Sequence, residues 1–175
     1  MVRGSPLRVR AAGYEDGVPI GWLVLDGLDD APSSDRGPVD VGDEPVDIGT
    51  AIVETALARD ALLYVAEDED GVLGAGRVGA RELVRSRHVG DLAVLVHPRA
   101  RRRGVGRALM EALVGGAEAS RRFEKLAVRI AADDEALRRT VMGSGAWRLE
   151  RLEIGALARG ERRIDVEVMG LSVRR

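Results

Sequence analysis

The segment from Val89 to Gly116 constrains the fold most, because it joins a strand-like run to an amphipathic helix. Residues 89–97, VGDLAVLVH, are almost continuously apolar, which predicts a strand buried on both faces. Pro98 ends that strand. After Gly104 apolar residues recur at helical spacing, at Val105, Ala108, Leu109, Ala112 and Leu113. A strand followed closely by a helix that packs on its sheet predicts a layered α/β or α+β domain.

Periodicity and turn residues predict the remaining elements. Further strands are expected at 6–12, 61–67, 72–84, 125–132, 147–155 and 162–173, and further helices at 18–28, 47–60 and 133–143. Asp47 is the expected cap of the second of these helices. The predicted order is β-α-α-β-β-β-α-β-α-β-β. No repeat or linker divides the chain, so we expect residues 1–175 to form a single domain.

Composition excludes several classes of protein. Hydrophobic residues make up 45% and charged residues 32%, which is typical of a globular chain. A net charge of −2 argues against a dedicated nucleic-acid-binding domain. The absence of cysteine excludes disulfides, thiolate metal sites and a cysteine nucleophile. No signal peptide and no apolar run of membrane-spanning length is evident, so we expect a cytoplasmic protein without a membrane partner.

The run VHPRARRRGVGRAL, residues 96–109, has three interpretations: a nucleic-acid patch, a cradle for a phosphorylated ligand, or a solvated corner. Its arginine content carries little weight, because Lys125 is the only lysine among the 27 Lys and Arg residues. An aromatic content of 3% argues against stacking on nucleic-acid bases. Gly104 and Gly106 lie at a predicted helix start, where free backbone amides and the helix dipole favour an anion. The dinucleotide fingerprint fails, because Leu109 stands where its third glycine is required.

What remains is Arg101-x-x-Gly104-x-Gly106 preceded by Val96-x-Pro98. The stretch VHPRARRRGVGRALMEAL resembles the acyl-CoA-binding motif of the GNAT superfamily of N-acetyltransferases, whose pattern is Q/R-x-x-G-x-G/A after a V-x-P strand end. The resemblance implies a single-layer mixed, mostly antiparallel sheet of about six or seven strands, flanked by about four helices. It also implies that the strands near 91–97 and 125–131 splay apart to admit the cofactor.

The resemblance further implies an acyltransferase that uses acetyl-CoA and no metal. The acetyl group would pass by direct attack on the thioester to a primary amine of a small molecule or peptide. The implied cofactor-binding residues are Val94, Leu95, Val96, Arg101, Arg102, Arg103, Gly104, Val105, Gly106, Arg107 and Asp134. Homodimers are common in such folds, although no residue here indicates one.

His88 and Asp91 are the candidate general bases, because both lie on the strand that enters the motif. In a regular strand His88 shares a face with Val94 and Val96, whereas Asp91 shares a face with Leu95. The alternative is an ordinary surface residue at a strand entry for His88 and a polar residue at a strand edge for Asp91. His97, next to Pro98, is expected to be structural.

The family commonly carries a tyrosine on the next helix, in a pattern like N-x-x-A-x-x-x-Y-x-x-x-G-F. The segment DDEALRRTVMGSGAW places either Val141 or Thr140 at that position, depending on whether Gly145 or Ala136 is aligned. Neither alignment supplies a tyrosine. Two other functions therefore stay open: a catalytically degenerate coenzyme A-binding regulatory or sensor protein, and a polyanion-binding protein.

Three further features concern the acceptor pocket or the core. The loop 29–47 is acidic and is either a wall that favours a cationic acceptor or a solvated connection. Trp22 is expected in the core, with an acceptor pocket as the alternative. Trp147 is expected in the core or at the cofactor edge.

Overall fold

One seven-stranded sheet organises the residues that the computed structural model describes, which are 6–27, 31–34 and 42–173. The strands are β1 (Arg8–Ala11), β2 (Leu62–Asp68), β3 (Gly71–Ala80), β4 (Val89–Val96), β5 (Lys125–Ala131), β6 (Arg148–Arg159) and β7 (Arg162–Ser172). The helices are α1 (Gly17–Gly27), α2 (Pro45–Ala58), α3 (Val105–Ser120) and α4 (Glu135–Met142). The sheet order is β1-β2-β3-β4-β5-β7-β6, and every neighbouring pair is antiparallel except β4 and β5. The predicted fold class and element order are confirmed.

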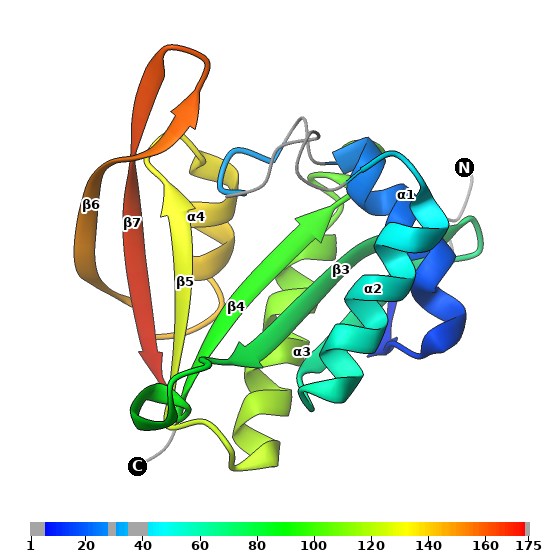
Figure 1. Ribbon diagram of the computed structural model, residues 1–175, viewed down its shortest axis with the longest axis horizontal. Helices are drawn as coiled ribbons and strands as arrows, with labels where there is room; N and C mark the ends of the chain where they lie inside the picture. The colour runs from blue at the N-terminus through cyan, green and yellow to red at the C-terminus, as the bar shows by residue number, and fades with distance from the viewer. Residues whose placement is uncertain (1–5, 28–30, 35–41, 174–175) are drawn as a thin grey trace.

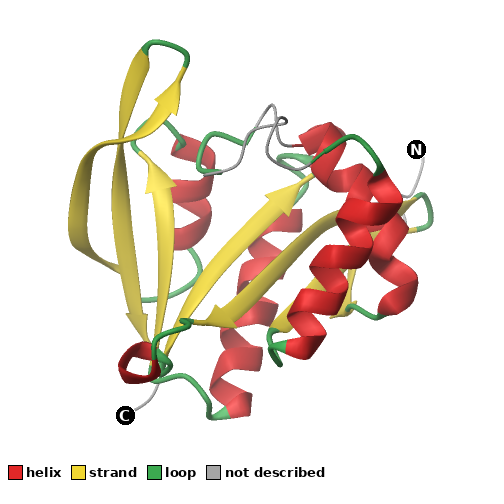
Figure 2. Ribbon diagram, viewed as in Figure 1, coloured by secondary structure: helices red, strands yellow, loops and turns green. Residues whose placement is uncertain are grey.

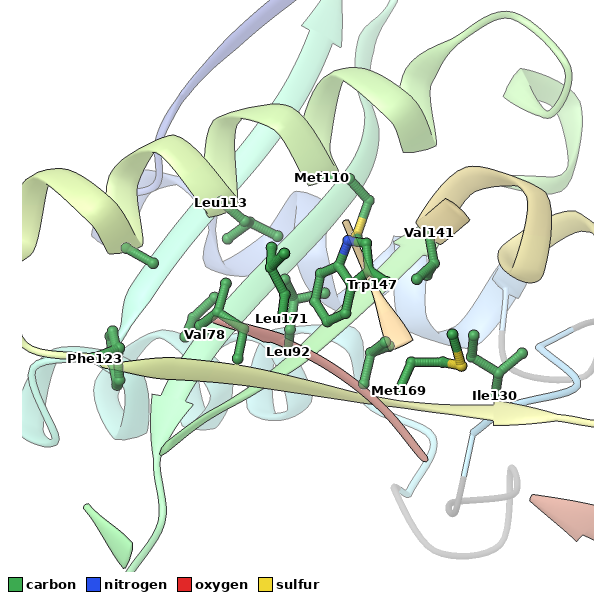
Figure 3. Packing of buried hydrophobic residues seen from close by; sticks show 13 residues of the cluster. Val78, Leu92, Met110, Leu113, Phe123, Ile130, Val141, Trp147, Met169 and Leu171 are labelled. Atoms are coloured by element: carbon green, nitrogen blue, oxygen red, sulfur yellow. The ribbon is translucent and has the colours of Figure 1, made fainter. Parts of the chain in front are cut away.

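Helices cover both faces of the sheet, with α1 and α2 on one face and α3 and α4 on the other (Figures 1 and 2). The larger core lies under α3 and α4, where Met110, Leu113 and Trp147 pack together (Figure 3). A second core beneath α1 and α2 contains Ile20 and Leu23. Trp147 is in the core, one of its two predicted places. Across the described ranges, no helix is long and apolar enough to cross a membrane.

Glycine permits α1 and α2 to cross at very short distance. A Cβ atom on Gly21 would lie 1.7 Å from the carbonyl oxygen of Pro45, and one on Gly49 would lie 1.6 Å from that of Gly17. These distances leave no room for any side chain at either position. The glycines that weaken the helix signal of α1 are therefore required by its packing.

Three local predictions were wrong. Asp47 does not cap α2, because the helix begins at Pro45 with Glu44 before it, so that Asp47 lies in the first turn. Trp22 is 54% exposed, since α1 turns Ile20 and Leu23 toward the sheet instead. β4 is not buried on both faces: Asp91 and Ala93 are exposed on the face that α1 and α2 cover only in part.

Candidate functional site

The sheet opens between β4 and β5. The two strands pair in parallel from Val89 and Lys125 to Leu92 and Val128, and their register ends there. Beyond this point their ends diverge (Figure 1). Residues 93–96 of β4 are therefore no longer paired with β5, and we call this separation of the two strands the opening.

The backbone of Val94 and Val96 faces this opening. At the two ends of the β3–β4 pair, Arg81 N–H donates to Val89 O (3.3 Å) and His97 N–H donates to Leu73 O (2.9 Å). Hydrogen-bonded and non-hydrogen-bonded pairs alternate along an antiparallel ladder, and the register between these two bonds is unbroken. Residues 91, 93 and 95 therefore bond to β3, whereas the N–H and C=O groups of Val94 and Val96 point toward β5, which no longer pairs with them.

The opposite edge of the opening is tied to the connection between α1 and α2. Ser33 Oγ accepts a hydrogen bond from Ala131 N–H (2.9 Å) and donates one to Asp134 Oδ2 (2.7 Å). Asp134 Oδ1 accepts from Leu137 N–H (3.0 Å) and so caps α4. Both carboxylate oxygens of Asp134 are thus engaged inside the protein. This predicted cofactor residue holds the α1–α2 connection beside the wide end of the opening.

The start of α3, next to Val96, has the geometry that suits an anion. Gly104, the residue before the helix, has φ +85° and no side-chain cap. The first bond of the helix runs from Ala108 N–H to Gly104 O (3.0 Å), so the amides of residues 105–107 have no acceptor within it. A Cβ on Gly104 would meet no atom within 4 Å, and one on Gly106 would lie 3.5 Å from Val96 Cγ2. The helix start is therefore open to a ligand and close to the end of β4.

The predicted arginines have different surroundings. Arg103 Nη2 lies 2.9 Å from Asp68 Oδ2, whose side chain is only 4% exposed, and this ion pair anchors the loop to the end of β2. Arg107 pairs with Glu111 one helical turn away (2.8 Å), and that hydrogen bond raises the arginine pKa. Arg101 and Arg102 lie on the exposed surface of the loop. The helix start thus offers backbone amides, with arginines around them, as groups suited to an anion.

Thr140, and not Val141, faces the start of α3. Val141 is fully buried and lies near Met110 and Trp147 (Figure 3). Thr140 Cγ2 lies 3.7 Å from the position that a Cβ on Gly106 would occupy. The Thr140 hydroxyl donates to Ala136 O (2.9 Å). Of the two residues that the alignments of this helix place at the tyrosine position, Thr140 is thus the one that faces the start of α3.

Asp91 lies on the α1/α2 face, one residue before the last paired residue of β4. Arg81 holds its carboxylate through three hydrogen bonds of 2.9–3.1 Å, and the aspartate side chain remains 56% exposed. This aspartate also lines a cavity of about 210 Å³, together with Thr55, Ala56, Arg59, Ala61, Arg77, Gly79, Ala80, Arg81 and Glu82. A carboxylate is thus available in a concave surface beside the opening.

His88 lies at the other end of β4, where the strands are still paired. Its carbonyl oxygen accepts from Glu124 N–H (2.9 Å), and the residue is exposed. Six residues of strand, roughly 20 Å, separate it from Val94. The structure therefore brings Asp91 toward the opening and leaves His88 away from it.

His97, just after the end of β4, and Glu153, on β6, are two other titratable residues, and both are held by internal contacts. His97 Nδ1 accepts from Arg99 N–H (3.1 Å), and Nε2 lies 3.2 Å from Asp26 Oδ2, so both ring nitrogens are engaged. Hydrogen bonds from Arg151 and Arg129 lower the pKa of Glu153 and keep it ionised. His97 is placed as expected of a structural residue.

The acidic loop 29–47 is described only in part: residues 31–34 and 42–47 are described, the last three of them in α2, whereas 29–30 and 35–41 lie outside the described residues. The prediction of an acidic wall therefore falls in part on residues that the structure does not describe. Within the described part, Arg159 Nη2 donates to Pro32 O (2.9 Å) and to Asp133 Oδ1 (2.8 Å), and Arg159 Nη1 donates to Asp133 Oδ2 (2.6 Å). These hydrogen bonds lower the pKa of Asp133. The described ranges contain no group of three or more side chains suited to a metal ion.

Comparison with known proteins agrees with this geometry. Residues 59–138 match the family model of the acetyltransferase (GNAT) domain, in agreement with the resemblance of the motif. No curated protein matches the chain, whereas 428 chains of solved structures do.

Three of these structures show the extent of the likeness. The GNAT superfamily phosphinothricin acetyltransferase of Sinorhizobium meliloti in complex with acetyl-CoA has 20% identity and a TM-score of 0.84, covering 96% of this chain and 89% of that one. The ribosomal-protein-alanine N-acetyltransferase of Brucella melitensis has 22% identity and a TM-score of 0.84 (94% and 99% covered). The yncA protein of Salmonella typhimurium, solved with its cofactor acetyl-CoA, has 19% identity and a TM-score of 0.86 (97% and 95% covered). At these identities the likeness establishes the fold.

Proposed function

We propose that this chain, which has the GNAT acetyltransferase fold and matches the family's domain over residues 59–138, is an acetyl-CoA-dependent N-acetyltransferase that acts on a primary amine. The observation that carries the proposal is the opening between β4 and β5. The unpaired backbone of Val94 and Val96 lines this opening, and the uncapped start of α3 lies at its end. An amide-containing tail and a pyrophosphate need this combination of groups.

The residues present suit acetyl-CoA. The amides of Val105, Gly106 and Arg107 would bind the pyrophosphate, and Arg101 and Arg102 would add positive charge at its rim. Val94 and Val96 would pair with the pantetheine arm as a missing strand would. Bound acetyl-CoA would supply a thioester whose carbonyl carbon accepts the amine and whose sulfur leaves with the electron pair. An N–H of β4 directed into the opening would stabilise the charge that develops on the thioester oxygen.

Asp91 is the general base in this proposal. An amine is mostly protonated at neutral pH and must lose a proton as it attacks. Asp91 can accept that proton, directly or through water, because its carboxylate is exposed on the α1/α2 face near the point where the strands part. Arg81 acts as a positioning residue, since its bidentate contact fixes the carboxylate.

The leaving sulfur would take its proton from solvent. Thr140 faces the start of α3, but its hydroxyl already donates to the helix backbone. A thiol has an ordinary pKa of about 8.5, so a thiolate leaves readily without a protein acid. Positioning of the two reactants would supply much of the acceleration.

The test is release of free thiol from acetyl-CoA in the presence of a panel of primary amines, measured with Asp91→Asn and His88→Ala. We expect amine-dependent release by the native chain. Asp91→Asn should lower kcat by roughly 100-fold or more, because a positioned base contributes about 10²–10⁴-fold. His88→Ala should change kcat by less than about 3-fold, since the residue lies far from the opening.

Binding is followed in parallel by the rise in melting temperature that acetyl-CoA produces, which should persist in both variants. Binding of acetyl-CoA without release of free thiol in the presence of any amine would instead identify a coenzyme A-binding protein without turnover. A full loss of kcat in His88→Ala, with Asp91→Asn unaffected, would reverse the assignment of the base.

A further inference from the structure

The cavity beside Asp91 contains one charged side chain without a partner. Two of the three arginines that line it are neutralised: Arg59 pairs with Glu82 (2.8 Å) and Arg81 pairs with Asp91 (2.9 Å). The third, Arg77, has no hydrogen-bond or ion-pair partner among the residues that the structure describes. The cavity therefore carries a net positive charge, located on Arg77.

Arg77 points along the sheet toward Asp91. On β3 it pairs with Ala93 of β4, and Gly79 pairs with Asp91. A Cβ built on Gly79 would lie 3.9 Å from Arg77 Nη1, so the guanidinium extends over this glycine, which is the residue paired with Asp91. Same-face diagonal neighbours on paired strands are about 7–8 Å apart, within reach of two groups on one small molecule.

Two opposite charges thus line one cavity from neighbouring strands, close to Leu92, where the pairing of β4 with β5 ends. Ala93, between them and Val94, is exposed, which leaves that part of the sheet uncovered. A cavity of about 210 Å³ is smaller than the roughly 300–1,000 Å³ of sites for drug-sized ligands, and so suits a small molecule.

Building on the proposed function, we infer that the acceptor is a small amine that also carries a carboxylate, as an amino acid does. Arg77 binds the carboxylate, and Asp91 receives the proton of the amine. A guanidinium presents paired donors that match a carboxylate, and an amine without an anionic group would leave this arginine unused. Arg77 is therefore the specificity-determining residue of the acceptor site.

The experiment compares matched acceptors that differ only in the carboxylate: L-alanine with ethylamine, L-methionine with 3-(methylthio)propylamine, and L-phenylalanine with phenethylamine. For each pair, we take the ratio of kcat/KM for the amino acid to kcat/KM for the amine without the carboxylate. This ratio is measured in the native chain, in Arg77→Ala and in Arg77→Lys. Comparing the ratio between variants cancels the intrinsic difference in amine reactivity. We expect Arg77→Ala to lower the ratio by about 10- to 100-fold, the range expected for a hydrogen-bonded charge pair, and Arg77→Lys to restore part of it.

Arg85→Ala is the matched control, because Arg85 is an exposed arginine of the β3–β4 connection that does not line the cavity. Its ratio should equal that of the native chain. An unchanged ratio in Arg77→Ala would overturn the inference, as would turnover confined to peptide amines. Absence of turnover with every amine, despite binding of acetyl-CoA, would instead count against the proposed function itself.

Discussion

Gly104 is the residue on which the proposed anion binding depends most directly. Its positive φ sets the direction in which the first amides of α3 point, and the space around its Cα is empty. Asparagine and aspartate are the side chains that best tolerate this backbone conformation. Asparagine and aspartate have nearly the same shape and differ in charge. Comparing the two variants at position 104 therefore separates the effect of charge from the effect of backbone strain.

We expect Gly104→Asp to lower the affinity for acetyl-CoA by at least about 10-fold relative to Gly104→Asn, because its carboxylate would repel a pyrophosphate. Without ligand, Gly104→Asp should be at least as stable as Gly104→Asn, since a negative charge at a helix start is favourable. Isothermal titration with acetyl-CoA and urea unfolding measure the two quantities. Equal affinities in the two variants would place the pyrophosphate elsewhere.

Single residues differ in how far the sequence predicts their roles. Gly104 and Gly106 could be proposed as anion-binding residues because their spacing matches the motif of a known family and because they lie at a predicted helix start. Arg77 could not, because the chain is rich in arginine and only the pairing of Arg59 and Arg81 singles it out. Asp134 was predicted to bind the cofactor, yet a serine 101 positions away occupies one of its carboxylate oxygens. Such a contact has no local signal in the sequence.

At the scale of elements, the orientation of α4 decides which of its side chains faces the start of α3. Its sequence allows two alignments, and the choice depends on packing: Val141 fills the core near Trp147, whereas Thr140 turns toward Gly106. The point at which β4 and β5 part was expected only from family resemblance. Apolar patterning predicts both strands but not the residue at which their pairing ends.

A tyrosine placed at each of the two positions tests this orientation. Val141→Tyr should destabilise the fold by about 1–3 kcal/mol or more, because a phenol would overfill a closed core. Thr140→Tyr should cost less than about 1 kcal/mol, since the side chain can extend along the half-buried surface. Urea unfolding gives both values, and a larger cost at Thr140 would contradict the assigned face of α4.

At the scale of the whole molecule, the site needs contacts that bring distant parts of the chain together. The α1–α2 connection reaches β5 through Ser33 and β6 through Arg159, while α3 follows directly from β4. The order of elements could be predicted because each has its own periodicity. The crossing of α1 and α2 and the anchoring of their connection could not, because they depend on close backbone approach and on single side-chain bonds.

The central claim is that the opening in the sheet and the start of α3 together bind acetyl-CoA. Residue-resolved amide hydrogen exchange, with and without acetyl-CoA, tests it most directly. We predict that the amides of Val94, Val96 and Gly106 gain protection, whereas those of Ala93 and Leu95, already bonded to β3, change little. Binding of acetyl-CoA with no added protection at Val94, Val96 and Gly106 would contradict this account.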